Sequence, residues 1–163
     1  MSSGATATFF AVGYLVVAQS STLAAEARAG MSVQIHNWDH ADMTRLSPAA
    51  IRDELARTMN VVGAVTGRRP TCFRPPYGST NANVVAEGAK LGLTQILWNV
   101  DPSDYRWPGA SVIVDRVLRE ANCRGLVVGI HDGGGDRSQT VAALPAIIEG
   151  LRARGYTFVR LCA

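Results

Sequence analysis

Two kinds of apolar pattern alternate along the chain and predict its secondary structure. Short apolar runs predict strands over residues 7–12, 32–35, 93–100, 125–130 and 156–161. Residues 71–74 are expected to form a brief extended segment that leads into Pro75 and Pro76. Apolar residues spaced three and four apart predict helices over residues 15–29, 48–66, 83–91, 112–121 and 140–154. Ser47 and Pro48 mark the start of the helix over 48–66, and Gly67 marks its end. Strands separated by helices pair in parallel through right-handed crossovers, so the pattern predicts an α/β sheet or barrel.

The first thirty residues allow two interpretations. An apolar run over residues 7–18, followed by small residues, is similar to a secretory signal with a cleavage site. Such a signal begins with positive charge, whereas the first basic residue here is Arg28. The run is also broken by Gly13 and is too short to span a bilayer. We therefore favour a strand followed by a helix, and we expect no transmembrane segment.

Composition indicates one ordinary globular domain, which we place over residues 1–163. Apolar residues make up 47% and charged residues 18% of the 163 residues, which excludes a disordered chain and a coiled coil. The net charge is only +3, and the basic residues are scattered arginines with Lys90 as the single lysine. A nucleic-acid surface needs a basic cluster, so we expect no nucleic-acid partner.

The three cysteines, Cys72, Cys123 and Cys162, are widely spaced and form no CxxC pair. They allow one disulfide with one thiol left over, or three reduced thiols. A Cys72–Cys123 pair is one option, if the two residues lie on neighbouring strands.

Polar side chains follow the predicted strands at their carboxyl ends. All three histidines lie there: His36 and His40 after the strand over 32–35, and His131 after the strand over 125–130. Arg74 and the acidic residues Asp101 and Asp104 follow two other strands. In α/β sheets and barrels this edge carries the chemistry, so these residues are the candidate site.

His36 and His40 are the candidate metal ligands. Their four-residue spacing brings two imidazoles to one point on a helix or tight turn, and neutral imidazoles suit zinc. A catalytic metal has three protein ligands and an open position, so a third ligand is expected from a neighbouring strand end.

Five motifs occur in order along the chain and together resemble one known family. They are ATFF (7–10), HNWDH (36–40), FRPPYG (73–78), VDPSDYRWPG (100–109) and a C-terminal stretch that begins GIHDGGGDRSQT (129–140). This order resembles the polysaccharide deacetylases, the NodB homology domain of carbohydrate esterase family 4, and its arginine-rich style resembles actinobacterial members. The resemblance implies a distorted (β/α) barrel that removes acetyl groups from N-acetylglucosamine units of peptidoglycan or chitin, or from acetylated xylan. It also implies a divalent metal, zinc or else cobalt, and a place at the cell envelope or outside the cell.

In the first half of the chain, the resemblance assigns roles to four residues. His36 and His40 would be metal ligands. Arg74 would hold the catalytic-base aspartate, and Tyr77 would line the site and offer its backbone N–H to the oxyanion.

The second half would supply the acid and part of the substrate site. His131 would protonate the departing amine, and Asp104 would hold His131 in its charged form. Tyr105 would form part of the groove wall, and Ile130 would line the acetyl pocket.

The chain departs from the family at one motif. Family members carry a TFDDG-type element ahead of the ATFF segment, and its two aspartates are the base and the third metal ligand. This sequence has no Asp-Asp pair, and its first carboxylate is Glu26. We therefore expect a barrel that lacks its first strand, whose unpaired strand edges favour self-association. An incomplete chain, a partner that supplies the strand and a non-catalytic descendant all fit this pattern.

Two functions from different classes follow from these observations. The first is a metal-dependent glycan deacetylase, indicated by the motif order and the three histidines. The second is a non-catalytic glycan-binding or vestigial domain, indicated by the missing carboxylates. An unrelated zinc hydrolase would rest on His36 and His40 alone.

Overall fold

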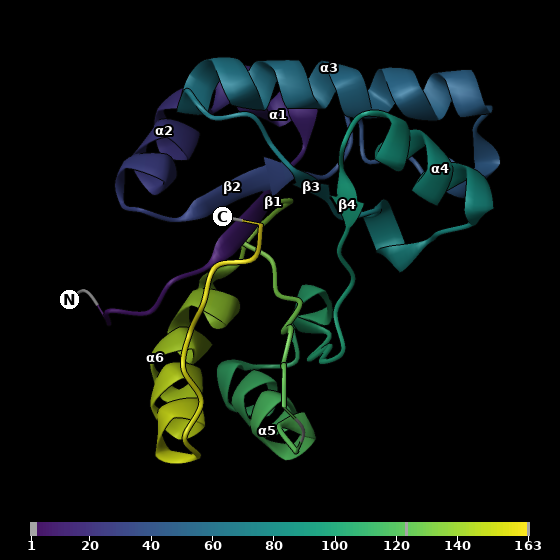
Figure 1. The fold of residues 1–163 in the computed structure, drawn as a ribbon. Coiled ribbons are helices and arrows are strands. Elements are labelled where there is room, and N and C mark those ends of the chain that lie inside the picture. The colour runs from purple at the N-terminus through teal and green to yellow at the C-terminus, as the bar shows by residue number, and fades with distance from the viewer. Residues whose placement is uncertain (1–2, 123, 163) are drawn as a thin grey trace. The chain divides into compact units, whose positions relative to one another are not determined.

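The computed structural model describes residues 3–122 and 124–162, and within it the chain divides into two compact units (Figure 1). The sheet unit comprises Thr6–Leu97 together with residues 159–162. The helix unit comprises Trp98–Phe158 together with residues 3–5. Among the described residues, none of the helices is long and apolar enough to cross a membrane.

The sheet unit contains four short parallel strands in the order β1-β2-β3-β4. They are β1 (Thr8–Ala11), β2 (Ser32–Ile35), β3 (Cys72–Phe73) and β4 (Thr94–Gln95). In register, Phe10 lies beside Gln34, and Ile35 lies beside Phe73. The α/β class predicted from the alternation of patterns is confirmed.

Four helices belong to the sheet unit: α1 (Gly13–Ala18), α2 (Ser20–Arg28), α3 (Pro48–Thr66) and α4 (Ala82–Lys90). Short helical turns lie at η1 (Met43–Arg45) and η2 (Pro76–Gly78). The apolar faces of these helices share one core with the sheet, which includes Ile35, Ile51, Leu55, Val62 and Phe73. The predicted single helix over residues 15–29 is wrong, because the backbone leaves helical geometry at Gln19 and α2 starts anew.

The predicted boundaries of α3 are confirmed by its caps. The Ser47 hydroxyl accepts the Ala50 amide N–H at 3.2 Å, with Pro48 at the first helical position. Gly67 ends the helix in the left-handed conformation (φ 68°), which glycine adopts without steric cost.

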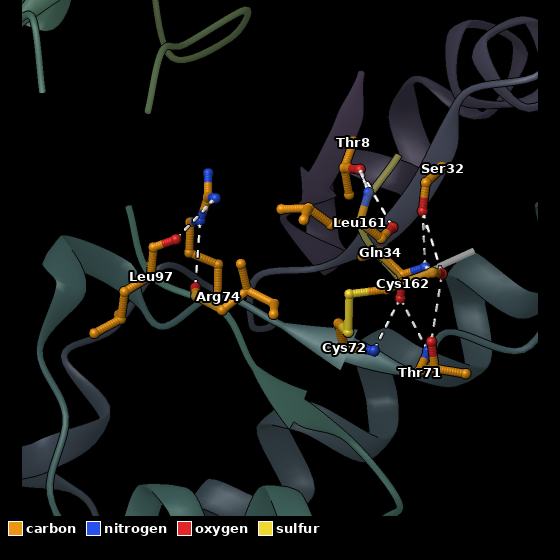
Figure 2. The surroundings of a disulfide bond; sticks show 10 residues. Thr8, Ser32, Gln34, Thr71, Cys72, Arg74, Leu97, Leu161 and Cys162 are labelled. Carbon is orange, nitrogen blue, oxygen red and sulfur yellow. Dashed lines mark hydrogen bonds between the residues drawn. A yellow bond between two sulfur atoms is a disulfide. The ribbon is translucent and has the colours of Figure 1, made fainter. Parts of the chain in front are cut away.

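The C-terminal strap, residues 160–162, crosses the sheet unit near the amino ends of its strands (Figure 2). The Leu161 amide donates to the Thr8 hydroxyl at 2.9 Å, and Gln34 Nε2 donates to the Cys162 carbonyl at 2.9 Å. A disulfide joins Cys162 to Cys72 on β3. The disulfide considered between Cys72 and Cys123 is therefore wrong, and Cys123 itself lies outside the described residues.

The predicted strand over residues 156–161 is also wrong. Tyr156 and Phe158 pack on the core of the helix unit, and the following residues form the C-terminal strap. The strap bonds to side chains of the sheet unit, such as Thr8 and Gln34, and a strand would need the backbone groups of a neighbouring strand.

The helix unit is built around α5 (Ala110–Glu120) and α6 (Ser138–Ala153), which pack side by side (Figure 1). A short turn, η3 (Asp104–Arg106), precedes α5. The two helices bury one core, formed by Val100, Ile113, Val117, Ala121, Ala143, Ile147 and Leu151.

Among the described residues of the helix unit, the predicted strand over 125–130 and the end of the predicted strand over 93–100 are reduced to one bridge between Val100 and Val128. The Asn99 side chain explains much of this difference. Its amide nitrogen donates to the Gly125 carbonyl at 3.2 Å, and its oxygen accepts the Val127 amide at 2.8 Å. Side-chain bonds therefore occupy backbone groups that a regular ladder would use. Of the predicted strand over 93–100, only β4 and the bridge at Val100 remain.

Candidate functional site

His36 and His40 meet at the carboxyl end of β2. Their ring centroids are 4.9 Å apart. The Nδ1 atom of His36 is hydrogen-bonded to the Arg74 carbonyl oxygen, and a carbonyl can only accept, so His36 carries its proton on Nδ1. His40 Nδ1 lies 3.1 Å from the Tyr77 hydroxyl. With Nδ1 engaged in both rings, Nε2 is the nitrogen through which each would coordinate a metal.

The backbone of the HNWDH loop, residues 36–40, is fixed from within by Asn37. This side chain is fully buried, at 0% exposure. Its oxygen accepts the His40 amide at 2.8 Å, and its nitrogen donates to the Ala41 carbonyl at 3.0 Å. His40 adopts a left-handed conformation (φ 65°), which a residue with a Cβ adopts only when its surroundings impose it.

Glu54 on α3 is hydrogen-bonded to the backbone of the same loop. Its carboxylate oxygen Oε2 accepts the amide N–H groups of Trp38 and Asp39 at 3.0 and 3.3 Å. Glu54 is only 9% exposed. Burial raises the pKa of the Glu54 carboxyl, and the amide donors partly oppose that shift.

The Trp38 ring packs where Gly13 leaves room for it. A Cβ atom on Gly13 would lie 2.5 Å from the Trp38 ring and 2.8 Å from the Thr58 hydroxyl oxygen. The Arg57 guanidinium covers the ring at 4.2 Å from its centroid. Trp38 is thus packed into the base of the HNWDH loop.

Arg74 follows β3, and its backbone N–H donates to the Ile35 carbonyl at 3.0 Å. The guanidinium lies 4.2 Å from the centroid of the Phe10 ring and donates to the carbonyls of Ile96 and Leu97 at 3.4 Å (Figure 2). Burial lowers the pKa of Arg74 to about 10. Its expected role as the partner of a carboxylate base stays a prediction.

Tyr77 lies in η2 of the sheet unit with its ring exposed. Its backbone is left-handed (φ 61°), and its ring contacts His40 edge-on, with centroids 4.8 Å apart. The FRPPYG motif thus brings two groups to the histidine pair, the Arg74 carbonyl and the Tyr77 hydroxyl.

In the helix unit, the buried Asp104 carboxylate pairs with the half-exposed His131 imidazole. Asp104 is 1% exposed, and its Oδ1 lies 2.8 Å from His131 Nδ1. Its Oδ2 accepts the His131 amide at 2.9 Å and the Thr140 hydroxyl at 2.7 Å. Burial raises the pKa of Asp104, but the bonds from His131 and Thr140 outweigh it and hold that pKa below its usual value. The His131 side chain remains 48% exposed, so the imidazole extends from a buried anchor toward solvent.

Two other predicted residues of the helix unit lie close to this pair in space or in sequence. The Tyr105 ring contacts the His131 ring edge-on, with centroids 5.7 Å apart. Ile130 directly precedes His131 and is partly buried. Their roles as groove wall and acetyl pocket stay predictions.

The candidate metal site meets one requirement for binding a divalent ion and does not meet another. His36 and His40 fit a divalent ion as a pair of imidazole ligands whose orientation is already set by hydrogen bonds. Within residues 3–122 and 124–162, no three His, Cys, Asp or Glu side chains gather closely enough to share an ion. The described part of the chain therefore presents two candidate ligands, where a catalytic metal site is expected to have three.

The structure brings the predicted residues together in two sets, one in each unit. His36, His40, Arg74 and Tyr77 are in contact in the sheet unit, and Asp104, Tyr105 and His131 are in contact in the helix unit. Sequence reasoning missed three supporting side chains, namely Asn37, Glu54 and Thr140. For Glu54 a signal was available, because it lies three residues after Ile51 on the apolar face of its helix, where a carboxylate needs a partner.

Comparison with known proteins gives a consistent family match. The sequence profile named polysaccharide deacetylase matches residues 2–96. A peptidoglycan-N-acetylglucosamine deacetylase of Listeria monocytogenes is 34% identical over 95% of the chain, which spans 32% of that relative. A chitooligosaccharide deacetylase of Bradyrhizobium is 35% identical over 92% of the chain and 74% of that relative.

Solved structures agree with the sequence match. A family 4 carbohydrate esterase from Streptomyces lividans, in complex with acetate, has a TM-score of 0.88 and 35% identity, covering 95% of the chain and 78% of the esterase. A CE4 family pseudoenzyme from Bacillus anthracis has a TM-score of 0.91 and 30% identity, covering 96% of the chain and 54% of the pseudoenzyme. The similar proteins therefore include enzymes as well as a pseudoenzyme.

Proposed function

The chain belongs to the polysaccharide deacetylase family, and from this premise we propose that it removes acetyl groups from glycans that contain N-acetylglucosamine. The observation that carries the proposal is the Asp104–His131 pair. A buried carboxylate holds a half-exposed imidazole, which is the arrangement that a general acid needs.

His131 would supply the proton for the leaving group. When water adds to the acetyl carbonyl and the carbon–nitrogen bond breaks, the sugar amine leaves with a proton taken from His131 Nε2. Asp104 would stabilise a positive charge on His131 before the transfer, and Thr140 and the His131 amide hold that carboxylate in place by hydrogen bonds.

The sheet unit would supply the metal ligands His36 and His40. A divalent ion held by these histidines, zinc or cobalt, would polarise the acetyl carbonyl and activate water. The Arg74 carbonyl and the Tyr77 hydroxyl orient the two imidazoles. The Tyr77 backbone N–H would stabilise the oxyanion. The Arg74 guanidinium would hold a carboxylate base that takes the proton of the attacking water. The sequence has no Asp-Asp pair, so this base would have to come from a partner that supplies the strand carrying that pair.

The substrate class rests on the relatives. Peptidoglycan and chitooligosaccharide deacetylases are among them, so both glycans are candidate substrates, with Tyr105 and Ile130 contacting the acetylated sugar. We place the protein at the cell envelope or outside the cell. The Cys72–Cys162 disulfide supports this placement, because disulfides persist in oxidising compartments.

The test is acetate release from N-acetylglucosamine oligosaccharides by the full chain, with Zn²⁺ or Co²⁺ added. We expect metal-dependent release that His131→Ala abolishes. Asp115→Ala changes an exposed carboxylate on α5 of the same unit and should leave the release unchanged. Release that survives in His131→Ala would contradict the proposed acid.

A non-catalytic glycan-binding domain is the second candidate. It is favoured by the candidate metal site, because within the described residues no third His, Cys, Asp or Glu side chain joins His36 and His40, whereas a catalytic metal needs three ligands. This candidate predicts oligosaccharide binding without acetate release at any metal concentration. Metal-dependent release by the wild-type chain would exclude it.

A further inference from the structure

We propose that Glu54 is a positioning residue for the HNWDH loop, and that its buried carboxylate sets the geometry in which His36 and His40 bind a metal ion. The inference rests on the proposed function, because it assumes that these two histidines are ligands. It adds a residue outside all five sequence motifs.

The geometry places Glu54 directly under the turn between the two histidines. One oxygen of its carboxylate accepts both the Trp38 and the Asp39 amide N–H, at 3.0 and 3.3 Å. Those two residues, with Asn37, form the whole backbone between the ligands. Charge-assisted bonds of this kind are about twice as strong as neutral ones.

The buried position of Glu54 on α3 supports a role for its carboxylate in binding the loop amides. It lies on the face of the helix that buries Ile51 and Leu55, and it is 9% exposed. Burying a carboxylate costs free energy unless hydrogen bonds compensate, and the loop amides provide those bonds. One turn later, the Thr58 hydroxyl donates to the Glu54 carbonyl at 2.8 Å, so the helix backbone beneath the loop is also fixed.

Loss of the carboxylate would leave two amide groups of a strained turn without their acceptor. His40 depends on that turn, because its left-handed backbone follows directly after Asp39. A loop that relaxes by about one ångström changes the separation of the two rings, and second-sphere changes of this size typically cost about 10- to 100-fold in metal affinity.

The experiment compares Co²⁺ binding by the wild-type chain with binding by variants at Glu54. Binding is measured by calorimetry and by the visible absorption of the bound ion. Glu54→Leu should weaken Co²⁺ binding by about 10-fold or more. Glu54→Gln keeps an oxygen that can accept the same two amides, so it should restore most of the affinity and the wild-type spectrum.

Glu87→Leu is the matched control. Glu87 on α4 is equally buried, at 3% exposure, and is paired with Arg52 at 2.8 Å and Lys90 at 2.6 Å, on a helix that does not carry the loop. Its replacement should lower stability and leave Co²⁺ affinity unchanged. An equal loss of affinity in Glu87→Leu would mean that general destabilisation explains both variants, and would overturn the proposal.

Amide hydrogen exchange separates a failure of this inference from a failure of the proposed function. Trp38 and Asp39 should exchange faster in Glu54→Leu than in wild type, with or without metal. Wild-type Co²⁺ affinity together with wild-type exchange in Glu54→Leu would overturn the inference. If the wild-type chain binds no Co²⁺, the metal site of the proposed function fails and the metal role of Glu54 fails with it, whereas faster exchange would still establish that Glu54 holds the loop.

Discussion

The two units hold their histidines in different ways, and the difference matches the roles proposed for them. In the sheet unit, His36 Nδ1 donates to the backbone carbonyl of Arg74, which is an uncharged acceptor. In the helix unit, the His131 ring is bonded to the buried Asp104 carboxylate, which can stabilise a positive charge on that ring. The hydrogen-bond partner of one ring nitrogen thus differs between the histidine proposed as a ligand and the histidine proposed as an acid.

The units also differ in what holds them together. The sheet unit has a four-strand parallel ladder, a shared core and a disulfide. In the described part of the helix unit, α5 packs on α6, one backbone bridge joins Val100 and Val128, and side-chain bonds from Asn99 and Asp104 fix the loops. Changes to the covalent link should therefore act on the first unit, and changes to buried polar groups on the second.

The largest effect is expected from breaking the disulfide. Cys162→Ser should destabilise the sheet unit by about 4 kcal/mol, because the bond closes a loop with a sequence separation of 90 residues. Urea unfolding measures the total loss, and amide exchange should show it more strongly in β2 than in α5. The variant should no longer respond to reductant. An equal loss of protection from exchange in β2 and α5 would contradict the expectation that the disulfide acts mainly on the sheet unit.

Asp104→Ala should cost about 3 kcal/mol, because it removes a buried carboxylate that accepts three hydrogen bonds. The pKa of Asp104 is lower in the fold than in the unfolded chain, so its contribution is complete above the unfolded pKa of about 4 and is lost as pH falls through the folded pKa. Stability measured against pH should therefore fall less steeply in acid for Asp104→Ala than for wild type. If the stability of Asp104→Ala falls as steeply in acid as that of wild type, the contribution of the lowered Asp104 pKa is contradicted.

Thr140→Val should cost about 2 kcal/mol, because the hydroxyl donates to a buried charged group and valine has nearly the same shape. The acid dependence of stability should also weaken, since this bond helps to lower the pKa of Asp104. Denaturant unfolding at pH 7 and pH 4 measures both effects. A variant as stable as wild type at both pH values would show that the Thr140 bond contributes nothing.

The smallest effects are expected from replacing one glycine in each unit with alanine. Gly13→Ala should cost about 1 to 2 kcal/mol, because the new Cβ would lie 2.5 Å from the tightly packed Trp38 ring. Gly150→Ala meets the flexible end of Leu118 at 2.7 Å, and the better helix propensity of alanine offsets the crowding, so its effect should be near zero. Thermal unfolding of the two variants checks the order, and the reverse order would contradict the packing described for Trp38.

The sequence predicted the α/β class, strands β1 and β2 and the limits of α3, because periodicity and capping are local signals. It also predicted that His36 and Arg74 would lie at strand ends. It did not predict the loss of the strands around Asn99 or the Cys72–Cys162 link, because both depend on which distant segments meet. Asn37 and Thr140 were missed for the same reason, since their partners are set by the fold. The apolar face of α3 marks Glu54 as a buried carboxylate, but it does not identify the loop amides that Glu54 binds.

The most direct test of the division between the two units is a calorimetric Zn²⁺ titration of the wild-type chain, His36→Ala and His131→Ala. We predict one-to-one binding in wild type, loss of binding in His36→Ala and unchanged binding in His131→Ala. Binding that survives in His36→Ala, or that is lost in His131→Ala, would contradict the assignment of the metal to the sheet unit and of the acid to the helix unit.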